Sequence, residues 1–281
     1  MAKPGARPWG YPIALENIRI DYGVPCRVRA KSDTIEGTFA IVQCLSGSES
    51  LQAYFLRAMG LVLETLPDSA PPVAIAEQLD DLVELFRAAT RPSSGSVMGL
   101  GGELFVTVNS RNPLAMIRAW HIEAEDHFDF TDGDQRLEIK CSGDGTRRHY
   151  FSLEQVYPPS GATVLVASLM VERIQGGLSL GELWDGASAC AALDPELRMK
   201  LERICLATLG DAWEKARAQE YDPHLARSSL AYYDVSSIPR VPDELTSGVS
   251  EVRFRSDLSL ASPVEVGPYT AQGRLFEACL G

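Results

Sequence analysis

The amino-acid sequence predicts an α/β fold, in which helices pack against a sheet. In the middle of the chain a helix pattern, two short strands, a second helix signal and another strand follow one another, and this mixture is typical of α/β layers. With 281 residues, of which 45% are hydrophobic, the chain is long enough to build a sizeable core. Its longest apolar runs, such as "ATVLVASLMV", are far shorter than the roughly 20 residues that a membrane span needs.

The first stretch, 1–92, is predicted to be β-rich and then helical. Its segments "ENIRIDYG", "PCRVRAK" and "GTFAIVQCL" are separated by Gly, Pro and polar residues, which predicts strands joined by turns. In "AIAEQLDDLVELFRAA" the apolar residues Leu79, Leu82 and Phe86 recur at the spacing of an amphipathic helix. "RPSSGS" at 91–96 breaks this pattern and predicts a domain boundary.

The middle stretch, 93–188, begins with the glycine-rich helix start "VMGLGGELFVTVNS". In "NPLAMIRAW" Asn112 is expected to cap a second helix, with Pro113 at its first position. Two strands, "HFDF" and "RLEIKCS", follow, and the Asp132-Gly133 pair between them is a strong signal for a two-residue hairpin turn.

The rest of this stretch continues the alternation. "HYFSLEQV" contains Ser152 and Gln155 at capping-box spacing, "ATVLVASLMVER" is typical of a buried strand, and "LSLGELW" predicts another helix. The last stretch, 189–281, opens with the helix pattern "PELRMKLERICLATLGDAWEKARAQ" and ends in the strand-like segments "SLAYYDVSSIPRVP" and "VSEVRFRSDL". We find no group of catalytic residues in this last stretch.

Composition limits the function classes. The formal net charge of −12 argues against binding nucleic acid unaided, because phosphate contacts need clustered Lys and Arg. The six cysteines form no C-x-x-C pair, which argues against a zinc ribbon or a disulfide scaffold. The basic N-terminus is followed by no apolar segment, so we expect no secretory signal, no membrane contact and a cytoplasmic protein.

The predicted hairpin brings charged residues together. With the Asp-Gly turn, Asp129 lies opposite Arg136, and Glu138 is its diagonal neighbour at a Cα separation of roughly 7–8 Å. Because side chains alternate along a strand, Asp129, Glu138 and Lys140 share one face. The other face is expected to carry Phe128, Phe130, Leu137, Ile139 and Cys141.

Two interpretations of this face remain open. Paired carboxylates suit a hard divalent cation, and a neighbouring ammonium can neutralise charge that develops on a phosphate. An exposed strand with weak ion pairs is the alternative. With five lysines and 38 acidic residues, about 0.7 acid-x-Lys triplets are expected by chance. The "EIK" triplet alone therefore does not separate the two.

A set of motifs, in order and spacing, resembles the PD-(D/E)XK nuclease pattern: "GLGGEL", "AW", "HFDF", "LEIKCS" and "SLEQV", which begin at 99, 119, 127, 137 and 152. More narrowly, they are similar to a bacterial family named only as a PD-(D/E)XK domain of unknown function, whose genes tend to lie among restriction and phage-defence genes. "YYDVSSIPRVP" and "GVSEVRFRSDL" are similar to the C-terminal block of that family. The resemblance implies a restriction-endonuclease-like core, a central mixed sheet flanked by helices, at 93–188. A β-rich and helical extension at 1–92 would precede it, and a helical plus β extension at 189–281 would follow.

The resemblance also implies roles for single residues. Glu103 is the acidic residue of the first core helix, Asp129 and Glu138 are metal-binding carboxylates, and Lys140 is the catalytic lysine. The carbonyl of Ile139 is a further oxygen ligand. The implied metal is Mg²⁺, for which Mn²⁺ can substitute.

The roles of five further residues are less determined. Gln155 matches a helical glutamine near the site of related nucleases, but it fits a plain helix cap with Ser152 equally well. Arg147, Arg148 and His149 either contact a phosphate backbone or form a solvated turn. Phe128 stands where the superfamily has the proline of its motif, a change that the narrower family tolerates.

The expected function is therefore a metal-dependent endonuclease that hydrolyses DNA as part of a restriction or anti-phage defence system. Because the chain is acidic, we expect DNA to be held only locally or by partner subunits, and duplex cutting makes a homodimer plausible. The alternative is a non-catalytic scaffold or adaptor that keeps the nuclease fold. Zinc deaminase, nucleotide-binding and serine hydrolase motifs are incomplete or absent.

Overall fold

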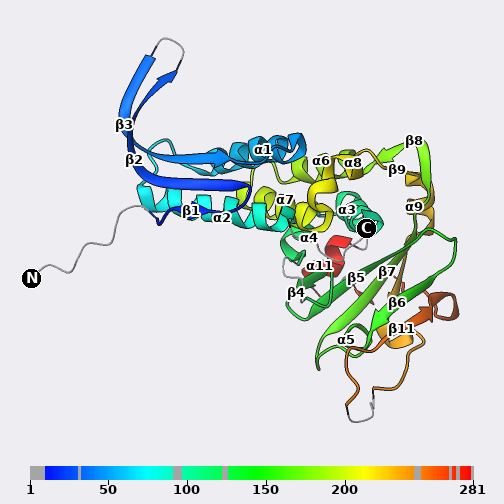
Figure 1. The fold of residues 1–281 in the computed structure, drawn as a ribbon. Helices are drawn as coiled ribbons and strands as arrows, with labels where there is room; N and C mark the ends of the chain where they lie inside the picture. Colours follow the sequence, from blue (N-terminus) through cyan, green and yellow to red (C-terminus); the bar gives the residue numbers. More distant parts are fainter. Residues whose placement is uncertain are drawn as a thin grey trace, which may run out of the picture. The chain divides into compact units, whose positions relative to one another are not determined.

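The computed structural model describes residues 10–30, 33–90, 97–121, 126–243, 248–265, 268–269 and 273–279. The chain divides into two compact units, 1–92 and 93–281, which are described separately (Figure 1). The predicted break "RPSSGS" at 91–96 lies outside the described residues. Within the described part of the chain, no helix combines the length and apolar character that crossing a membrane requires.

The first unit contains an antiparallel sheet of three strands, β1 (Ile13–Ala14), β2 (Ile18–Ala30) and β3 (Asp33–Cys44), in this order. The long strand β2 includes two segments that were predicted as separate strands. Gly23, with φ of 66°, lies where the register shifts between Asp21 and Val24. It therefore forms a bulge within one strand, and the predicted turn at this place is wrong.

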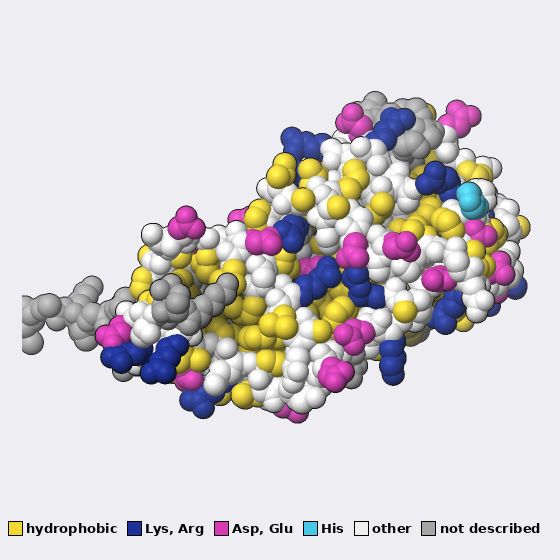
Figure 2. All heavy atoms as spheres, turned by 90° about the horizontal axis from the view of Figure 1, so that it is seen from above, with side chains coloured by type: hydrophobic (Ala, Val, Ile, Leu, Met, Phe, Trp, Pro, Cys, Tyr) yellow, Lys and Arg dark blue, Asp and Glu magenta, His cyan; other side chains and the backbone are white. Residues whose placement is uncertain are grey.

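Two helices complete this unit, α1 (Glu49–Thr65) and α2 (Pro72–Thr90). As predicted for α2, Leu79, Leu82 and Phe86 are buried. In contrast, α1 exposes Leu56 and Leu63, which are 70% and 64% accessible. Hydrophobic side chains gather on the surface of this unit in the view of Figure 2.

The second unit is built on a mixed sheet in the order β10-β7-β5-β4, formed by β4 (Phe130–Asp132), β5 (Gln135–Ser142), β7 (Thr163–Met170) and β10 (Ala231–Asp234). The central strands β5 and β7 are parallel, and the outer strands pair with them antiparallel. Helices flank this sheet, so the predicted α/β class with a central mixed sheet is confirmed (Figure 1).

The helices of this unit are α3 (Val97–Asn109), α4 (Pro113–Ala119), α5 (Leu153–Val156), α6 (Leu180–Cys190), α7 (Pro195–Leu209), α8 (Trp213–Arg217), α9 (Pro223–Ser229) and α11 (Arg274–Cys279). Two small antiparallel sheets pair β6 (Arg148–Ser152) with β11 (Arg253–Asp257), and β8 (Arg173–Ser179) with β9 (Glu220–Tyr221). The predicted caps of α4 and α5, by Asn112 and Ser152, are both present. Trp120, Trp184 and Trp213 are buried in the core.

The C-terminal helix α11 is fastened to the sheet by one buried side chain. Gln135, the first residue of β5, accepts hydrogen bonds at Oε1 from the backbone amides of Leu275 and Phe276, at 3.0 and 3.1 Å. Gln135 is only 2% exposed. Residues from the last stretch of the chain therefore belong to the same packed unit as the middle stretch.

Helix α3 packs unusually close to β5, and a glycine makes this possible. A Cβ atom at Gly102 would overlap the sulfur of Cys141 and lie 3.4 Å from the Ile139 side chain. At the preceding Gly101, a Cβ atom would meet only Leu180 and Tyr221 at an ordinary 3.7 Å. The glycine-rich start of α3 thus lets Glu103, the next residue, lie near the strand.

We expect Gly102→Ala to lower the free energy of unfolding by about 1–3 kcal/mol, because it overfills the contact between α3 and β5. The matched control, Gly101→Ala, should be neutral or should gain up to about 1 kcal/mol from its better helix propensity. Urea unfolding followed by tryptophan fluorescence measures both. Adding Cys141→Ala to Gly102→Ala should recover part of the loss. Equal midpoints for the two glycine variants would contradict the close approach.

Candidate active site

The hairpin of β4 and β5 aligns the acidic residues more directly than predicted. Phe130 pairs with Leu137 and Asp132 with Gln135, so the turn consists of Gly133 and Asp134. The predicted turn, one residue earlier, is wrong. Gly133 has φ of 58°, which a type II′ turn needs at its first central position. Continued by one residue, the observed register places Asp129 opposite Glu138, whereas the predicted register placed it opposite Arg136.

Asp129 lies at the end of a bend, just before β4, and is held at two points. Its Oδ2 atom accepts a hydrogen bond of 2.6 Å from the backbone amide of Ile139. Its backbone carbonyl accepts a 2.9 Å bond from the amide of His121, and the His121 ring nitrogen Nδ1 lies 3.0 Å from the same oxygen. Both contacts fix the direction of the carboxylate relative to β5.

Glu138, Lys140 and Gln155 form a connected group next to the Asp129 contact on β5. Lys140 Nζ lies 2.6 Å from Glu138 Oε1, and Gln155 Nε2 donates to the same oxygen at 2.7 Å. Lys140 also donates to Gln155 Oε1 at 3.4 Å. Both of these charged side chains are shielded from solvent, with 17% of Lys140 and 6% of Glu138 exposed.

Gln155 fulfils both interpretations that the sequence left open. Its Oε1 accepts a bond of 3.2 Å from the Ser152 amide and so completes the capping box of α5. Its Nε2 reaches Glu138 and, at 2.9 Å, the carbonyl of His127. One amide side chain therefore begins the helix and positions a site carboxylate.

Glu103 enters from α3 and is oriented by a tryptophan. Trp120 Nε1 donates to Glu103 Oε2 at 2.8 Å, while its ring stacks on Phe130 with 5.3 Å between centroids. The place of Trp120 in the "AW" motif was the one sequence signal for this contact.

Electrostatic interactions link these side chains. Burial, and then the charges of Glu138 and Glu103, raise the pKa of Asp129 well above its usual range, although the Ile139 amide and Lys140 act in the opposite direction. Burial also raises the pKa of Glu103, against the hydrogen bond from Trp120. The carboxylates repel one another in a protein environment that solvates them poorly. The site as a whole is short of positive charge.

A family described as "Putative PD-(D/E)XK family member, (DUF4420)" matches residues 26–259, which is most of the chain. The chain belongs to this family. Neither the curated proteins nor the solved structures contain a match to it.

In this PD-(D/E)XK chain, the predicted acid-x-Lys residues Glu138 and Lys140 lie on β5, and the predicted preceding acid, Asp129, bonds to the Ile139 amide between them. Among the residues that the structure describes, no three His, Cys, Asp or Glu side chains are grouped closely enough to hold a metal ion. The chemistry of the donors nevertheless fits a hard cation. Glu138 Oε2 is buried without a hydrogen-bond partner, and burial, followed by the charges of Glu138 and Glu103, raises the pKa of Asp129. The role of the Ile139 carbonyl stays a prediction, since the observed contact uses its amide.

The faces of β5 are less cleanly divided than predicted. Phe128 belongs to a buried cluster with Val164 and Val166, and Val166 pairs with Glu138 in parallel register. Residues paired in this way point to the same face, so placing Phe128 with Phe130 on the other face is wrong. Apolar packing therefore continues beside Glu138. Lys140 shares this packing, with its Nζ 5.0 Å from the centre of the Phe151 ring.

Two of the three residues predicted to contact DNA are engaged inside the protein. Arg147 donates to the carbonyl and hydroxyl of Ser168, both at 2.9 Å, and to the carbonyl of Ser229. His149 is 4% exposed, and its Nε2 lies 2.8 Å from the same hydroxyl. Burial, and then the charges of Lys140 and Arg147, lower the pKa of His149 to about 4. Only Arg148, which is exposed, remains a candidate for phosphate contact.

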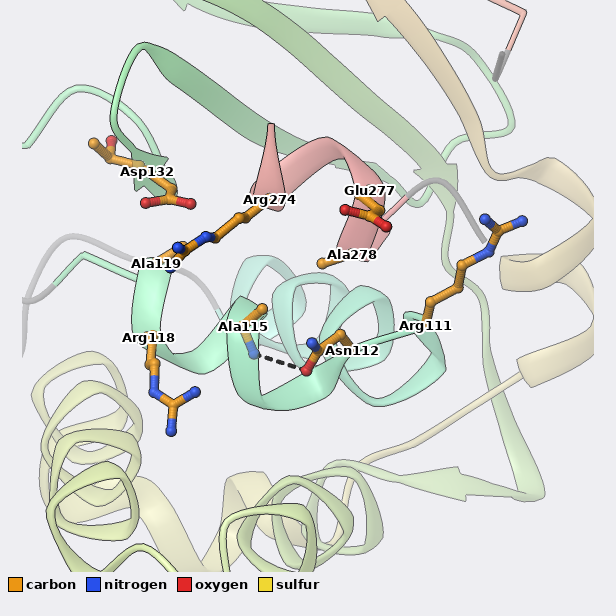
Figure 3. A pocket seen from close by; sticks show the side chains of 10 residues that line it. Arg111, Asn112, Ala115, Arg118, Ala119, Asp132, Arg274, Glu277 and Ala278 are labelled. Atoms are coloured by element: carbon orange, nitrogen blue, oxygen red, sulfur yellow. Dashed lines mark hydrogen bonds between the residues drawn. The ribbon is translucent and has the colours of Figure 1, made fainter. Parts of the chain in front are cut away.

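A cavity of about 530 Å³ lies between α4 and α11 and contains none of these catalytic candidates (Figure 3). Its walls include Arg111, Arg118 and Arg274, but also the carboxylates of Asp132 and Glu277. Arg118 is paired with Asp194 at 3.1 Å. In Figure 3 the side chains of Arg111, Arg118 and Arg274 extend in different directions. The mixed charge gives no preference for one class of ligand.

The raised pKa of Asp129 predicts a pH dependence of stability. A carboxyl group whose pKa is higher in the folded than in the unfolded state favours folding fully at low pH, and this stability is lost as pH rises through the folded pKa. We therefore expect Asp129→Asn, in chelator, to unfold at a higher temperature than wild type at pH 8. The difference should shrink toward pH 5, and thermal unfolding across this range measures it.

The exposed carboxylate of Asp144 is expected to change stability with pH in the opposite direction. Hydrogen bonds from Thr146 and Ser142 hold the pKa of Asp144 below its usual range, so Asp144→Asn should remove stability that is present at neutral pH and lost on acidification. If the unfolding temperatures of the Asp129 and Asp144 variants, relative to wild type, changed with pH in the same direction, the assigned electrostatics would be contradicted.

Proposed function

We propose that this protein is a divalent-metal-dependent nuclease that hydrolyses phosphodiester bonds of DNA. The observation that carries the proposal is the alignment of Asp129 with Glu138 beside Lys140, in a chain of the PD-(D/E)XK family. Glu103 and Gln155 support this group from two helices. PD-(D/E)XK nucleases are named for two acidic residues and a lysine, and we assign these roles to Asp129, Glu138 and Lys140.

In this proposal, Asp129 and Glu138, helped by Glu103, would hold Mg²⁺ or Mn²⁺. A bound divalent cation supplies a Lewis acid that polarises the phosphate. Gln155 and the Ile139 amide keep the two carboxylates in position. Lys140, desolvated against Phe151, would place its ammonium to orient an attacking water or to neutralise charge on the phosphate oxygens. The buried pair of Lys140 and Glu138 would open partly when substrate enters.

DNA would be gripped only locally by this chain. The net charge is −12, and on the described part of the face in Figure 2 basic and acidic side chains are interspersed, with no large basic patch. We therefore propose that other subunits of a restriction or phage-defence system, or a second copy of the chain, supply most of the affinity. Two copies would also provide the two active sites that cutting both strands requires.

One observation favours a second candidate function, a non-catalytic scaffold with a nuclease fold. The ammonium of Lys140 is satisfied within the protein by Glu138 and Gln155, as in a structural ion pair. Such a role would explain the fold without cleavage. The assay below separates the two candidates.

We expect wild type to cleave DNA with Mg²⁺ or Mn²⁺ and to lose this activity in chelator. Lys140→Ala and Asp129→Asn should each lower the cleavage rate by a factor of about 100 or more, because the first removes the ammonium that would neutralise charge on the phosphate and the second removes a carboxylate that would hold the metal ion. Lys215→Ala is the matched control, since Lys215 is an exposed lysine and should leave the rate unchanged. Gel analysis of plasmid and oligonucleotide substrates measures the rates. Activity that persists in both site variants would end the catalytic assignment.

Metal binding can be tested without cleavage. For a site of about millimolar Kd, 10 mM Mg²⁺ should raise the thermal unfolding midpoint of wild type by about 3–5 °C, because the ion binds only the folded state. Glu138→Gln and Asp129→Asn should lose most of this shift. Asp144→Asn serves as a control for nonspecific effects at an exposed carboxylate. Equal shifts in all four proteins would argue against a specific metal site.

A further inference from the structure

A second cavity, of about 450 Å³, adjoins the proposed catalytic group. Phe128, in its wall, directly precedes Asp129 in the chain. The carbonyl of His127, another wall residue, accepts a bond from the Gln155 nitrogen that also holds Glu138. Arg136 lies two positions before Glu138 on β5 and so faces the same side. The cavity therefore continues the face on which the scissile phosphate would lie.

Several residues that line this cavity carry rings. They are His127, Tyr157 and the largely buried Phe128, with Pro159 as an apolar neighbour, and Asp126 adds a carboxylate to the lining. Tyr157 is fixed, because its hydroxyl donates to the Val241 carbonyl at 2.8 Å and the Arg240 guanidinium lies 4.7 Å from its ring centre. A preformed cavity of this size, lined by several ring-bearing side chains, is suited to a planar ligand.

The rim of the cavity offers both a donor and an acceptor. Arg136 donates through one nitrogen to the carbonyls of Gly133 and Gln135, at 2.7 and 2.8 Å, which holds its guanidinium in place and leaves further N–H groups for a ligand. Glu154 provides a carboxylate at the rim. Hydrogen bonds from its own amide and from Ser152 keep its pKa low, so it accepts hydrogen bonds at neutral pH.

We infer that this cavity binds an unpaired nucleobase of the substrate, next to the phosphate that is cut. Every base has a flat face for the rings and an edge with donors and acceptors for Arg136 and Glu154. In a paired duplex both are covered, so the site selects nucleic acid that is single-stranded, mismatched or locally opened. This inference rests on the proposed nuclease function for the identity of the ligand, and it specifies the substrate class of that site.

The test is a binding measurement on the full chain in chelator and low salt, with an oligonucleotide that carries one 2-aminopurine. We expect wild type to quench the fluorescence of the single-stranded probe by stacking, and to bind the same sequence as a duplex at least about tenfold more weakly. Thr131→Trp fills the cavity from an exposed strand position, and His127→Ala removes one ring. Each should weaken single-strand binding by about tenfold.

His224→Ala is the matched control, since His224 is also exposed but lies on α9, and it should bind as wild type does. Circular dichroism shows whether each variant folds. If one variant does not fold, the binding result of the other tests the inference. Quenching unchanged in the folded variants, or equal affinity for duplex and single strand, would overturn the inference. Because no cleavage is measured, these results are independent of whether Lys140→Ala abolishes hydrolysis. Loss of cleavage with intact quenching would support the cavity and leave the catalytic step to its own test.

Discussion

Three carboxylates, Glu103, Asp129 and Glu138, influence one another electrostatically beside a single ammonium group. If all three were ionised, Lys140 would leave them with two uncompensated negative charges. Uncompensated charge is costly where solvent access is limited, so such a group must take up protons or a cation. The donors around it, from Trp120, the Ile139 amide and Gln155, reduce this cost only in part. This deficit of positive charge is the reason why we propose the group as a cation-binding site.

The architecture of the second unit serves to hold these charges close. Gly102 lets α3 approach β5, so Glu103 can come from a helix while Glu138 comes from the strand. Gln155 joins the start of α5 to Glu138. Gln135 ties the hairpin to α11 at the far end of the chain. Residues from the middle and the last stretches are therefore both needed to fix the hairpin.

Much of this could be predicted from the sequence, because the signals were local. The capping box at Ser152 and the cap at Asn112 depend on neighbours within a few residues. The turn was misplaced because an Asp-Gly pair fits either with both residues central or with Gly first, and only strand pairing decides. Strand pairing also depends on residues beyond the turn.

The remaining differences have long-range causes. Arg147 and His149 are basic residues in a turn-like segment, but both are bound to Ser168, about twenty positions later in the chain. Phe128 packs with β7, and Trp120 bonds to Glu103 on another helix. No local pattern contains these contacts. The cavity beside the site likewise combines residues from the hairpin and from α5, so it has no sequence signature.

The central claim is that the carboxylates compensate their shared charge by binding a divalent cation. A crystal structure grown with Mn²⁺, with anomalous scattering recorded, tests it most directly. The account predicts a peak with oxygen atoms of Asp129 and Glu138 at about 2.0–2.3 Å, and Lys140 displaced from Glu138. A structure at saturating Mn²⁺ with no peak there, and with Lys140 still paired to Glu138, would contradict it.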